Sequence, residues 1–363
     1  MSGYSLRLYS PAGASIGEIT QCTGIDLAYG QTTPGVCYVT TAAKVTSAMH
    51  LAPLSMLEIY RQVEGIWYNE GERIWWLMDA TDFVTADGLR GQQYTFYDAN
   101  AMLQGRYVLY QAGSANADMT GAADNLLKAI VNTNCGTGAD AARQWGGLSI
   151  QADLTACASI SKAFAWRPVL AVMQEICNQA SAGGNYLSWD FVRTGIGTQE
   201  MRTYNAQRGA NRGSTSGQIL RLTAESGSLE SPKLSFSRHG YPNHITAGGR
   251  GEETARSLQT VTDAQTPLGM LRFESFIDRR NTDNDTDLLS EANAQYQASR
   301  PRSMFDGSLG QTPSMRYGYD VNYGDKVNVE YAGYAFDCHI RAVHIAIDGD
   351  GNEALEVRLR NYE

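Results

Sequence analysis

Three glycines in the segment HITAGGRGEETARS, Gly248, Gly249 and Gly251, have the outline of a loop that could hold a phosphate group. A phosphate loop of the Walker A type needs Lys and then Ser or Thr after its last glycine, to reach the terminal phosphates and magnesium. Glu252 and Glu253 stand there instead, and two carboxylates repel a phosphate. The dinucleotide pattern GxGxxG also fails, because its third glycine is missing. The spacing therefore favours a tight hairpin turn or a bulge, in which glycine allows a positive φ or a close backbone approach.

Two acidic segments imitate calcium-binding loops. An EF-hand loop needs Gly at its sixth position and Glu at its twelfth. In DGDGN, Asp348–Asn352, these positions hold Glu353 and Leu359. The segment Asn281–Asp287 also fails, with Leu288 at the sixth position. We expect a β-turn for the first segment, a solvated loop that caps a helix for the second, and no metal site.

The five histidines and six cysteines form no catalytic or metal-binding pattern. No HExxH, CxxC or GxSxG motif is present. His339 and His344 lie an odd number of residues apart on one expected strand, so they point to opposite faces. The scattered cysteines are typical of reduced, mostly buried thiols. The sequence thus predicts no cofactor and no enzymatic activity, although a hydrolase whose site is assembled from distant residues remains a weaker alternative.

The bulk composition is that of a globular protein. The chain has 363 residues, 43% of them hydrophobic and 18% charged, and a formal net charge of -9. This length predicts two or three domains. The acidic balance argues against an extended nucleic-acid-binding surface, but it suits a channel through which DNA passes without sticking. No apolar run is long enough to span a membrane, so we expect no membrane anchor.

The pattern along the chain is β, then α, then β again. Short alternating segments rich in aromatic and β-branched residues predict strands over the first hundred residues and from Leu234 to the end, and YNEGER is expected to be a hairpin with Gly71 at its tip. Helical periodicity appears over 117–132, with Asp118 as a candidate N-cap, over 164–182, with Pro168 in the first turn and Gly183 and Gly184 at the end, and from Asp285, with Asp285 or Thr286 as cap. The polar loop around Arg208 is expected on the surface. These patterns predict an α+β, mostly β, fold.

Two local patterns carry a resemblance to a known family. HITAGGRGEETAR is similar to a strand, glycine-turn, acid and arginine pattern in the tail-hub, or baseplate-hub, proteins of long-tailed bacteriophages. Its arginines are Arg250 and Arg256. YGYDVNYGDKVNVEY resembles the same family's segment before its last barrel strands, with Asp320, Gly324, Asp325 and Val327 as the matching residues. The early LEIYRQVEGIWY and RIWWLMDATDF resemble the family's first barrel.

The resemblance implies two related, small β-barrel-like hub domains with helical or mixed insertions. We accordingly assign 1–112 to the first β-barrel domain, 113–230 to a helical or mixed domain, 231–264 and 311–363 to the two parts of the second barrel, and 265–310 to an insertion with one helix. Gly248, Gly249, Arg250, Gly251, Arg256, Asp320, Gly324 and Asp325 then become candidates for structural turns or interfaces.

The implied role is that of a structural virion protein made in the cytoplasm of a bacterial host and placed at the tip of the virion tail. Three copies would form a ring that joins the sixfold tail tube to the threefold tip and forms part of the DNA-ejection channel. The implied partners are two further copies, a tail-tube or distal tail protein, a tip, spike or fibre protein, a tape-measure protein, and the passing genomic DNA without sequence recognition. The alternative is a receptor- or glycan-binding tail adhesin that uses the many tyrosines and tryptophans.

Overall fold

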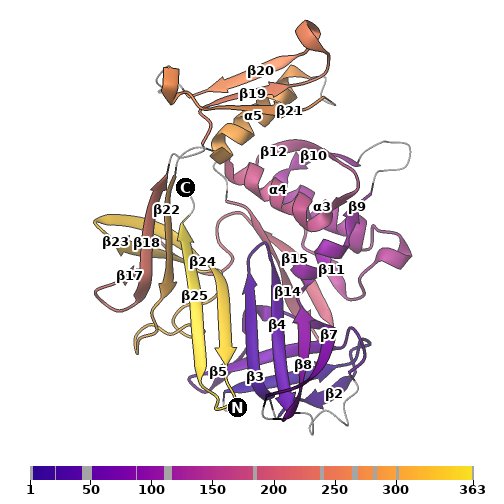
Figure 1. Ribbon diagram of the computed structural model, residues 1–363, viewed down its shortest axis with the longest axis vertical. Coiled ribbons are helices and arrows are strands. Elements are labelled where there is room, and N and C mark those ends of the chain that lie inside the picture. Colours follow the sequence, from indigo (N-terminus) through magenta and orange to yellow (C-terminus); the bar gives the residue numbers. More distant parts are fainter. Residues whose placement is uncertain are drawn as a thin grey trace.

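The computed structural model describes residues 3–20, 22–42, 51–86, 88–109, 117–182, 186–237, 241–263, 269–280, 284–299 and 302–361. It has three parts: in Figure 1 the largest lies on the left and at the bottom, the second on the right, and the third at the top. We call them the sheet body, the helical lobe and the small lobe. Strands dominate, so the expected α+β, mostly β, class is confirmed.

The sheet body is one 15-stranded sheet, and the described strands close no barrel. Its path runs β18 (Leu229–Ser237), β22 (Arg302–Leu309), β25 (Glu353–Asn361), β24 (Tyr334–Ile347), β3 (Cys22–Gly30), β4 (Thr33–Ala42), β8 (Arg90–Tyr97), β7 (Trp75–Val84), β5 (Met56–Val63), β1 (Tyr4–Tyr9) and β2 (Ser15–Glu18). Four strands pair beside this path: β6 (Ile66–Asn69), β16 (Asn211–Arg212), β17 (Arg221–Thr223) and β23 (Lys326–Tyr331).

The two β regions of the sequence, which were expected as two barrel-like domains, therefore meet edge to edge in one sheet. The cause is the length of β24. Its first half pairs with β23, and Ala342–Ile347 pairs with β3 from the other end of the chain. A single hydrophobic core spans the seam and includes Leu27, Phe96 and Val357. Local alternation predicts strands but does not reveal which strand edges will pair.

The helical lobe packs two antiparallel-sheet fragments and a mixed one around helices α3 (Ala123–Cys135) and α4 (Val169–Ala182). Its strands are β9 (Tyr107–Val108), β10 (Ala117–Ala122), β11 (Leu148–Ile150), β12 (Ser159–Phe164), β13 (Arg167–Pro168), β14 (Ser188–Gly195) and β15 (Thr198–Tyr204). The short helix α2 (Ala99–Met102) begins at Asp98, whose carboxylate accepts a hydrogen bond from the Ala101 amide. The remaining short 3-10 helices are η1 (Glu70–Glu72), η2 (Leu103–Gly105), η3 (Ala141–Arg143), η4 (Glu253–Ala255) and η5 (Gly269–Leu271).

Two local expectations in these parts were wrong. Residues 117–122 form β10, paired with β12, and the helix begins only at Ala123, so Asp118 is not its cap. Pairing with another strand overrode the helical spacing there. The segment around Gly71 is also not a hairpin tip. In a hairpin the strands before and after it, β6 and β7, would pair with each other, but each of them pairs with β5 instead.

The small lobe contains β19 (His244–Gly248), β20 (Leu258–Thr262), β21 (Glu274–Asp278) and α5 (Asp285–Ser299). Its three-stranded sheet, in the order β20-β19-β21, is separate from the large one. The lobe thus combines strands from the predicted 231–264 segment with the predicted insertion, whereas β18 and β22 belong to the sheet body. Asn284, rather than Asp285 or Thr286, caps α5, since its side chain accepts from the Thr286 amide at 2.9 Å. The predicted boundaries near residues 112 and 264, and Asn281–Asp283, lie outside the described residues.

Candidate functional site

The glycine segment connects β19 to β20, which pair antiparallel from His244–Thr262 to Gly248–Leu258. Gly251 has a φ of 101°, a left-handed conformation, and a Cβ added there would lie 2.9 Å from the carbonyl carbon of Ala255. The backbone closes the connection through Gly249 N–H to Ser257 O at 2.8 Å and Ser257 N–H to Arg250 O at 3.0 Å. Only glycine fits position 251 without strain.

Arg256 folds back over this connection. Its guanidinium donates to Gly249 O at 3.1 Å and to Gly248 O at 3.0 Å, and it pairs with Asp278 of β21. The same guanidinium lies 5.1 Å from the centre of the Phe276 ring. The arginine therefore satisfies the carbonyls of the turn and ties it to the neighbouring strand. Arg250, Glu252 and Glu253 are exposed beside it.

The second predicted group, in the segment before β23, lies in the sheet body and not beside the glycine turn. Gly324 has a φ of 87°, and its carbonyl accepts from the Gly209 amide at 2.8 Å. Asp325 is buried and accepts from Ala210 N–H at 2.6 Å and Asn322 N–H at 2.9 Å. Burial raises the pKa of Asp325, although the two amide hydrogen bonds act in the opposite direction. The Gly-Asp pair thus fastens the 208–210 loop onto the last β region.

Asp320 makes a more exposed clamp in the same segment. Its carboxylate accepts from the Arg316 amide and from Arg316 Nε, both at 2.9 Å, and its backbone carbonyl accepts from Arg212. The hydrogen bond from the Arg316 side chain lowers the pKa of Asp320. Arg316 also pairs with Glu64 in the turn between β5 and β6, at 2.6 Å. This clamp therefore joins the last β region to the first.

A buried ionic cluster, which we call the junction, lies behind the Gly-Asp turn. It consists of Arg73, Asp98, Asp190, Arg208 and Tyr323. Arg73 pairs with Asp98 and, at 2.9 Å, with Asp190, and it donates to the Tyr323 hydroxyl at 2.9 Å. Arg208 pairs with Asp190 at 2.9 Å and covers the Tyr323 ring at 4.7 Å. The two arginines and the two aspartates carry equal and opposite charges. Charged side chains are tolerated in a water-free interior when they are paired in this way.

The junction contains residues from all parts of the chain except the small lobe. Arg73 and Asp98 come from the first β region, Asp190 from β14, Arg208 from the polar loop, and Tyr323 from the last β region. Burial raises the pKa of Asp98 against the attraction of Arg73. Removing one member would leave an uncompensated buried charge, which typically costs about 3–5 kcal/mol. The junction therefore fixes the helical lobe and both β regions as one body.

Sequence reasoning missed the junction, and it placed Arg208 on the surface. The signals were weak but present. Arg73 directly precedes the apolar IWW, and Asp190 is a lone carboxylate within the strand YLSWDFV. A charge inside an apolar strand indicates a buried partner, but the partner's position in the sequence is not visible.

The described residues offer no assembled catalytic or metal-binding set. No group of three or more His, Cys, Asp and Glu side chains among them could hold a metal ion. Five of the six cysteines are buried, and burial raises the pKa of the Cys135 thiol to about 11. None of the helices in the described part of the chain has the length and apolarity that crossing a bilayer requires. The arrangement is thus one of turns, clamps and buried ion pairs.

The comparisons with known proteins identify the family. A family model described as "Siphovirus ReqiPepy6 Gp37-like protein" matches residues 5–359. The chain belongs to this family. It is a phage tail protein of the siphovirus type, and its location is the virion tail. No curated protein sequence matches it.

Three solved structures share the fold over nearly the whole chain. The tail protein from Neisseria meningitidis MC58 has 11% identity and a TM-score of 0.58, covering 99% of this chain and 97% of that chain. The 43 kDa tail protein of prophage MuSo2 from Shewanella oneidensis has 12% identity and a TM-score of 0.57, covering 98% of each. Prophage tail protein gp18 from Listeria monocytogenes EGD-e has 11% identity and a TM-score of 0.55, covering 98% of this chain and 94% of that chain. The expected resemblance to tail proteins of long-tailed phages is confirmed.

Proposed function

We propose that this chain is the trimeric hub at the tip of the virion tail, and that it forms part of the channel through which DNA leaves. The supporting observation is the full-length likeness of its fold to phage tail proteins. In this proposal each copy supplies its two β regions to a ring, so that three copies present six β faces to the tail tube and threefold symmetry to the tip. The partners would be the tail-tube or distal tail protein, the tape-measure protein, and a tip, spike or fibre protein.

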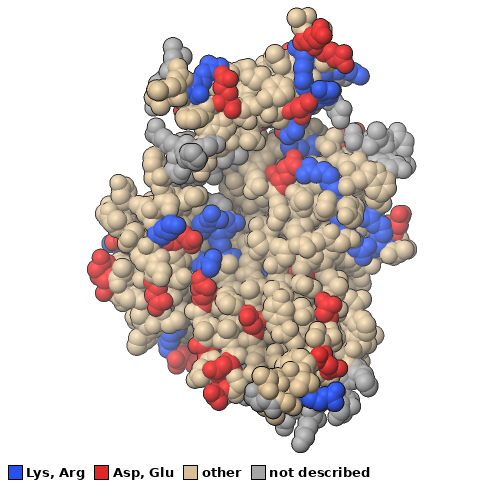
Figure 2. All heavy atoms as spheres, viewed as in Figure 1, with Lys and Arg blue, Asp and Glu red and all other residues tan. Residues whose placement is uncertain are grey.

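The junction supports this role physically. A ring whose subunits must hold their relative positions when force acts on it needs rigid subunits. Buried charge-assisted hydrogen bonds contribute to rigidity because they are directional. The junction and the continuous sheet hold the two β regions of each copy in one arrangement. Charges of both signs are interspersed on the face shown in Figure 2, without a continuous basic surface that would retain DNA.

We place one contact between copies at β6. This strand pairs with β5, and its side chains Ile66, Trp67 and Tyr68 are 49%, 44% and 36% exposed. Three large exposed side chains in a row on a short strand are typical of a protein interface. A permanent assembly of this kind would bury more than the roughly 1,200–2,000 Å² of a standard interface.

The test is the mass of the purified protein by sedimentation or light scattering across a concentration series. We expect three times the mass of one chain. Trp67→Lys should reduce the trimer fraction, whereas Leu89→Lys, on an exposed residue of the β7–β8 turn, should leave it unchanged. Cryo-electron microscopy of the virion should place three copies at the tail tip. A monomer bound at the side of the tail would overturn the proposal.

We also propose that the chain has no enzymatic activity. The basis is the use of its buried carboxylates and arginines in structural pairs. Purified protein should neither retain ATP analogues nor hydrolyse peptidoglycan. Turnover that disappears on substitution of a single Asp or His would contradict this.

A further inference from the structure

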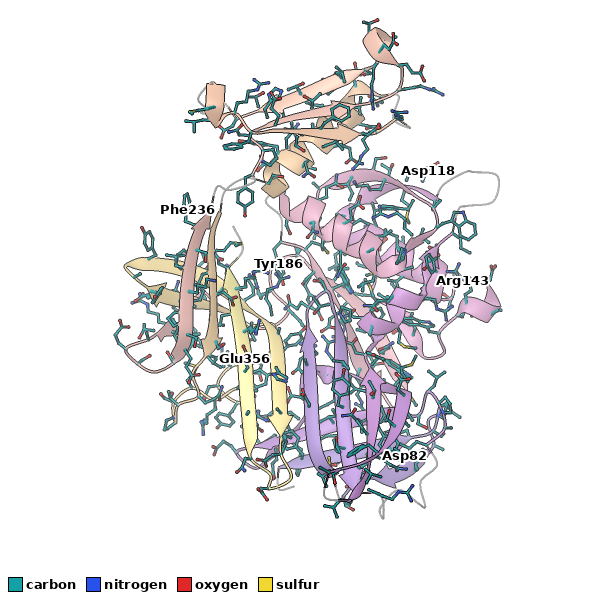
Figure 3. The ribbon with its side chains drawn as sticks, viewed as in Figure 1. Asp82, Asp118, Arg143, Tyr186, Phe236 and Glu356 are labelled. Carbon is teal, nitrogen blue, oxygen red and sulfur yellow. The ribbon has the colours of Figure 1, made fainter. Side chains whose placement is uncertain are left out.

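A trough of about 440 Å³ lies on the outer face of the sheet body, across β3, β4, β8, β24 and the start of β25. Its position is the seam where the first and last β regions meet. Glu356, labelled in Figure 3, lies on β25 just beyond it, opposite His344. The volume lies within the range of about 300–1,000 Å³ that is typical of small-molecule sites.

Side-chain size and strand register produce the hollow. Across the seam, Ala354 lies opposite Ala346, Ala346 opposite Asp26, and Asp26 opposite Tyr38. The two alanines make a low floor between taller neighbours. In the next row Gly24 lies opposite Thr40 and adds no side chain at all. The trough is thus a consequence of small residues on three adjacent strands, and it stays open without any movement of the chain.

The wall formed by β4 and β8 carries polar groups that are available for a ligand. The hydroxyls of Tyr38 and Thr40 and the amide of Gln93 all line the trough. Within the described part of the chain, none of these three side chains takes part in a hydrogen bond. Together they offer donors and acceptors within a small area, beside the aromatic ring of Tyr38.

The carboxylates of the trough are already engaged. Asp26 pairs with His344 at 2.8 Å. Asp348 accepts from the amides of Asp350 at 3.0 Å and Asn352 at 2.9 Å, and Glu353 pairs with Arg61. A divalent cation would have to displace these partners. An anion is disfavoured too, because the lining includes three acidic residues and no Lys or Arg.

We propose that this trough binds a neutral saccharide of one or two rings. The Tyr38 ring packs against the C–H face of a sugar, and Thr40 and Gln93 exchange hydrogen bonds with its hydroxyl groups. A neutral, hydroxyl-rich ligand matches a wall that has free donors and acceptors but no unpaired charge. The site is independent of the trimeric hub role, because every residue of it comes from one chain.

The test is saturation-transfer NMR on the purified full chain with four probes: D-glucose, D-galactose, N-acetyl-D-glucosamine and L-rhamnose. We expect transfer to the ring protons of at least one probe. Tyr38→Ala should weaken that binding at least tenfold. Ala354→Arg should abolish it, because the new side chain fills the floor, and position 354 is exposed, so the core is not disturbed.

Tyr334→Ala is the matched control, since Tyr334 is an exposed tyrosine of β24 outside the trough. It should bind the probe as the wild type does, and circular dichroism should show that all three variants are folded. The proposal is overturned if no probe receives transfer from the wild type, or if Ala354→Arg binds as well as the control. Binding of calcium or inorganic phosphate in place of all four sugars would also overturn it.

Discussion

Gly324 shows how a single backbone position supports the junction. It has a φ of 87°, and a Cβ there would lie 2.6 Å from Cβ of Arg208. Gly324→Ala therefore adds backbone strain of roughly 1–2 kcal/mol and also pushes Arg208 away from Asp190. Since disturbing a buried pair typically costs about 3–5 kcal/mol, we expect a total loss of several kcal/mol. Urea denaturation of the purified variant measures this loss.

Gly333 provides the matched control for that experiment. It has a similar φ of 80°, but a Cβ there meets nothing within 4 Å. Gly333→Ala should therefore cost only the backbone strain. If both variants lose the same free energy of unfolding, the contact between the Gly-Asp turn and Arg208 does not stabilise the protein.

His339 should make the stability depend on pH. Its buried ring stacks on Tyr186, which is labelled at the top of the sheet body in Figure 3, with 4.5 Å between ring centres. Burial and the nearby Lys326 and Arg341 lower the pKa of His339 to about 3, although Asp337 acts in the opposite direction. Below about pH 6.5 the unfolded chain takes up a proton at this position and the folded chain does not. Folding stability should therefore be complete above pH 6.5 and fall as the pH decreases towards 3.

The slope from one proton is at most about 1.4 kcal/mol per pH unit. His339→Phe keeps an aromatic ring for Tyr186 and should remove the part of the slope that comes from this proton between about pH 6.5 and pH 5. His344→Phe, at a half-exposed position of the same strand, should keep it. Urea denaturation at three pH values distinguishes them. Parallel pH profiles for wild type and His339→Phe would contradict the assignment.

At this scale the sequence indicated the turns but not their partners. Gly324 and Asp325 were candidates for a turn or interface because YGYDVNYGDKVNVEY resembles a segment of the tail-hub family, and Gly324 has the positive φ of a turn residue. Arg73 and Asp190 were not, because each lies in an ordinary strand pattern and their pairing joins positions more than a hundred residues apart. Pairs of that kind depend on the topology of the chain, which local periodicity does not contain.

Among the elements, the β19–β20 connection allows a test of the glycine turn. Gly251→Val combines a left-handed φ with a clash against the backbone of Ala255. Roughly 1–3 kcal/mol of strain is expected for a β-branched residue in that region. The amides of Gly249 and Ser257, which close the turn, should then exchange faster with solvent. Hydrogen exchange followed by mass spectrometry measures this directly.

Gly269→Val, in the same lobe, separates strain from crowding. Gly269 has a φ of 78°, and nothing lies within 4 Å of an added Cβ. Gly269→Val should leave the rate of amide hydrogen exchange in the β19–β20 turn close to that of the wild type. Equal protection in Gly251→Val and the wild type would show that the turn tolerates a side chain, contrary to our interpretation.

Periodicity predicted the helices and turns well where the segment carried only one kind of pattern, either helical or alternating. The helix at Val169–Ala182, the helix from Asp285 and the DGDGN turn between β24 and β25 agree with the structure, although Pro168 pairs with β9 instead of lying in the first helical turn. It failed at 117–122, where ADMTGA carries small residues that suit either state and β12 supplies the pairing. The separation of β19, β20 and β21 from the large sheet was equally invisible, since their alternation is the same as that of sheet-body strands.

For the whole molecule, the three parts differ in how firmly they are joined. The sheet body shares one core across both β regions, and the junction fixes the helical lobe to it. The small lobe has a much smaller core, formed by Ile245, Ala247, Leu288 and Ala292. It is held to the helical lobe through α5, where Glu291 pairs with Lys162 at 3.0 Å. A core of that size supports little independent stability.

Calorimetry should therefore show two transitions, the small lobe first and the sheet body together with the helical lobe at higher temperature. The variants Gly251→Val and Gly324→Ala show which part of the molecule each transition belongs to. Gly251→Val should lower only the first transition, and Gly324→Ala only the second, because the two glycines lie in parts with separate cores. If the first and last β regions melted separately, the continuous sheet and the junction would not unite them, and the rigid subunit on which the hub proposal relies would be lost.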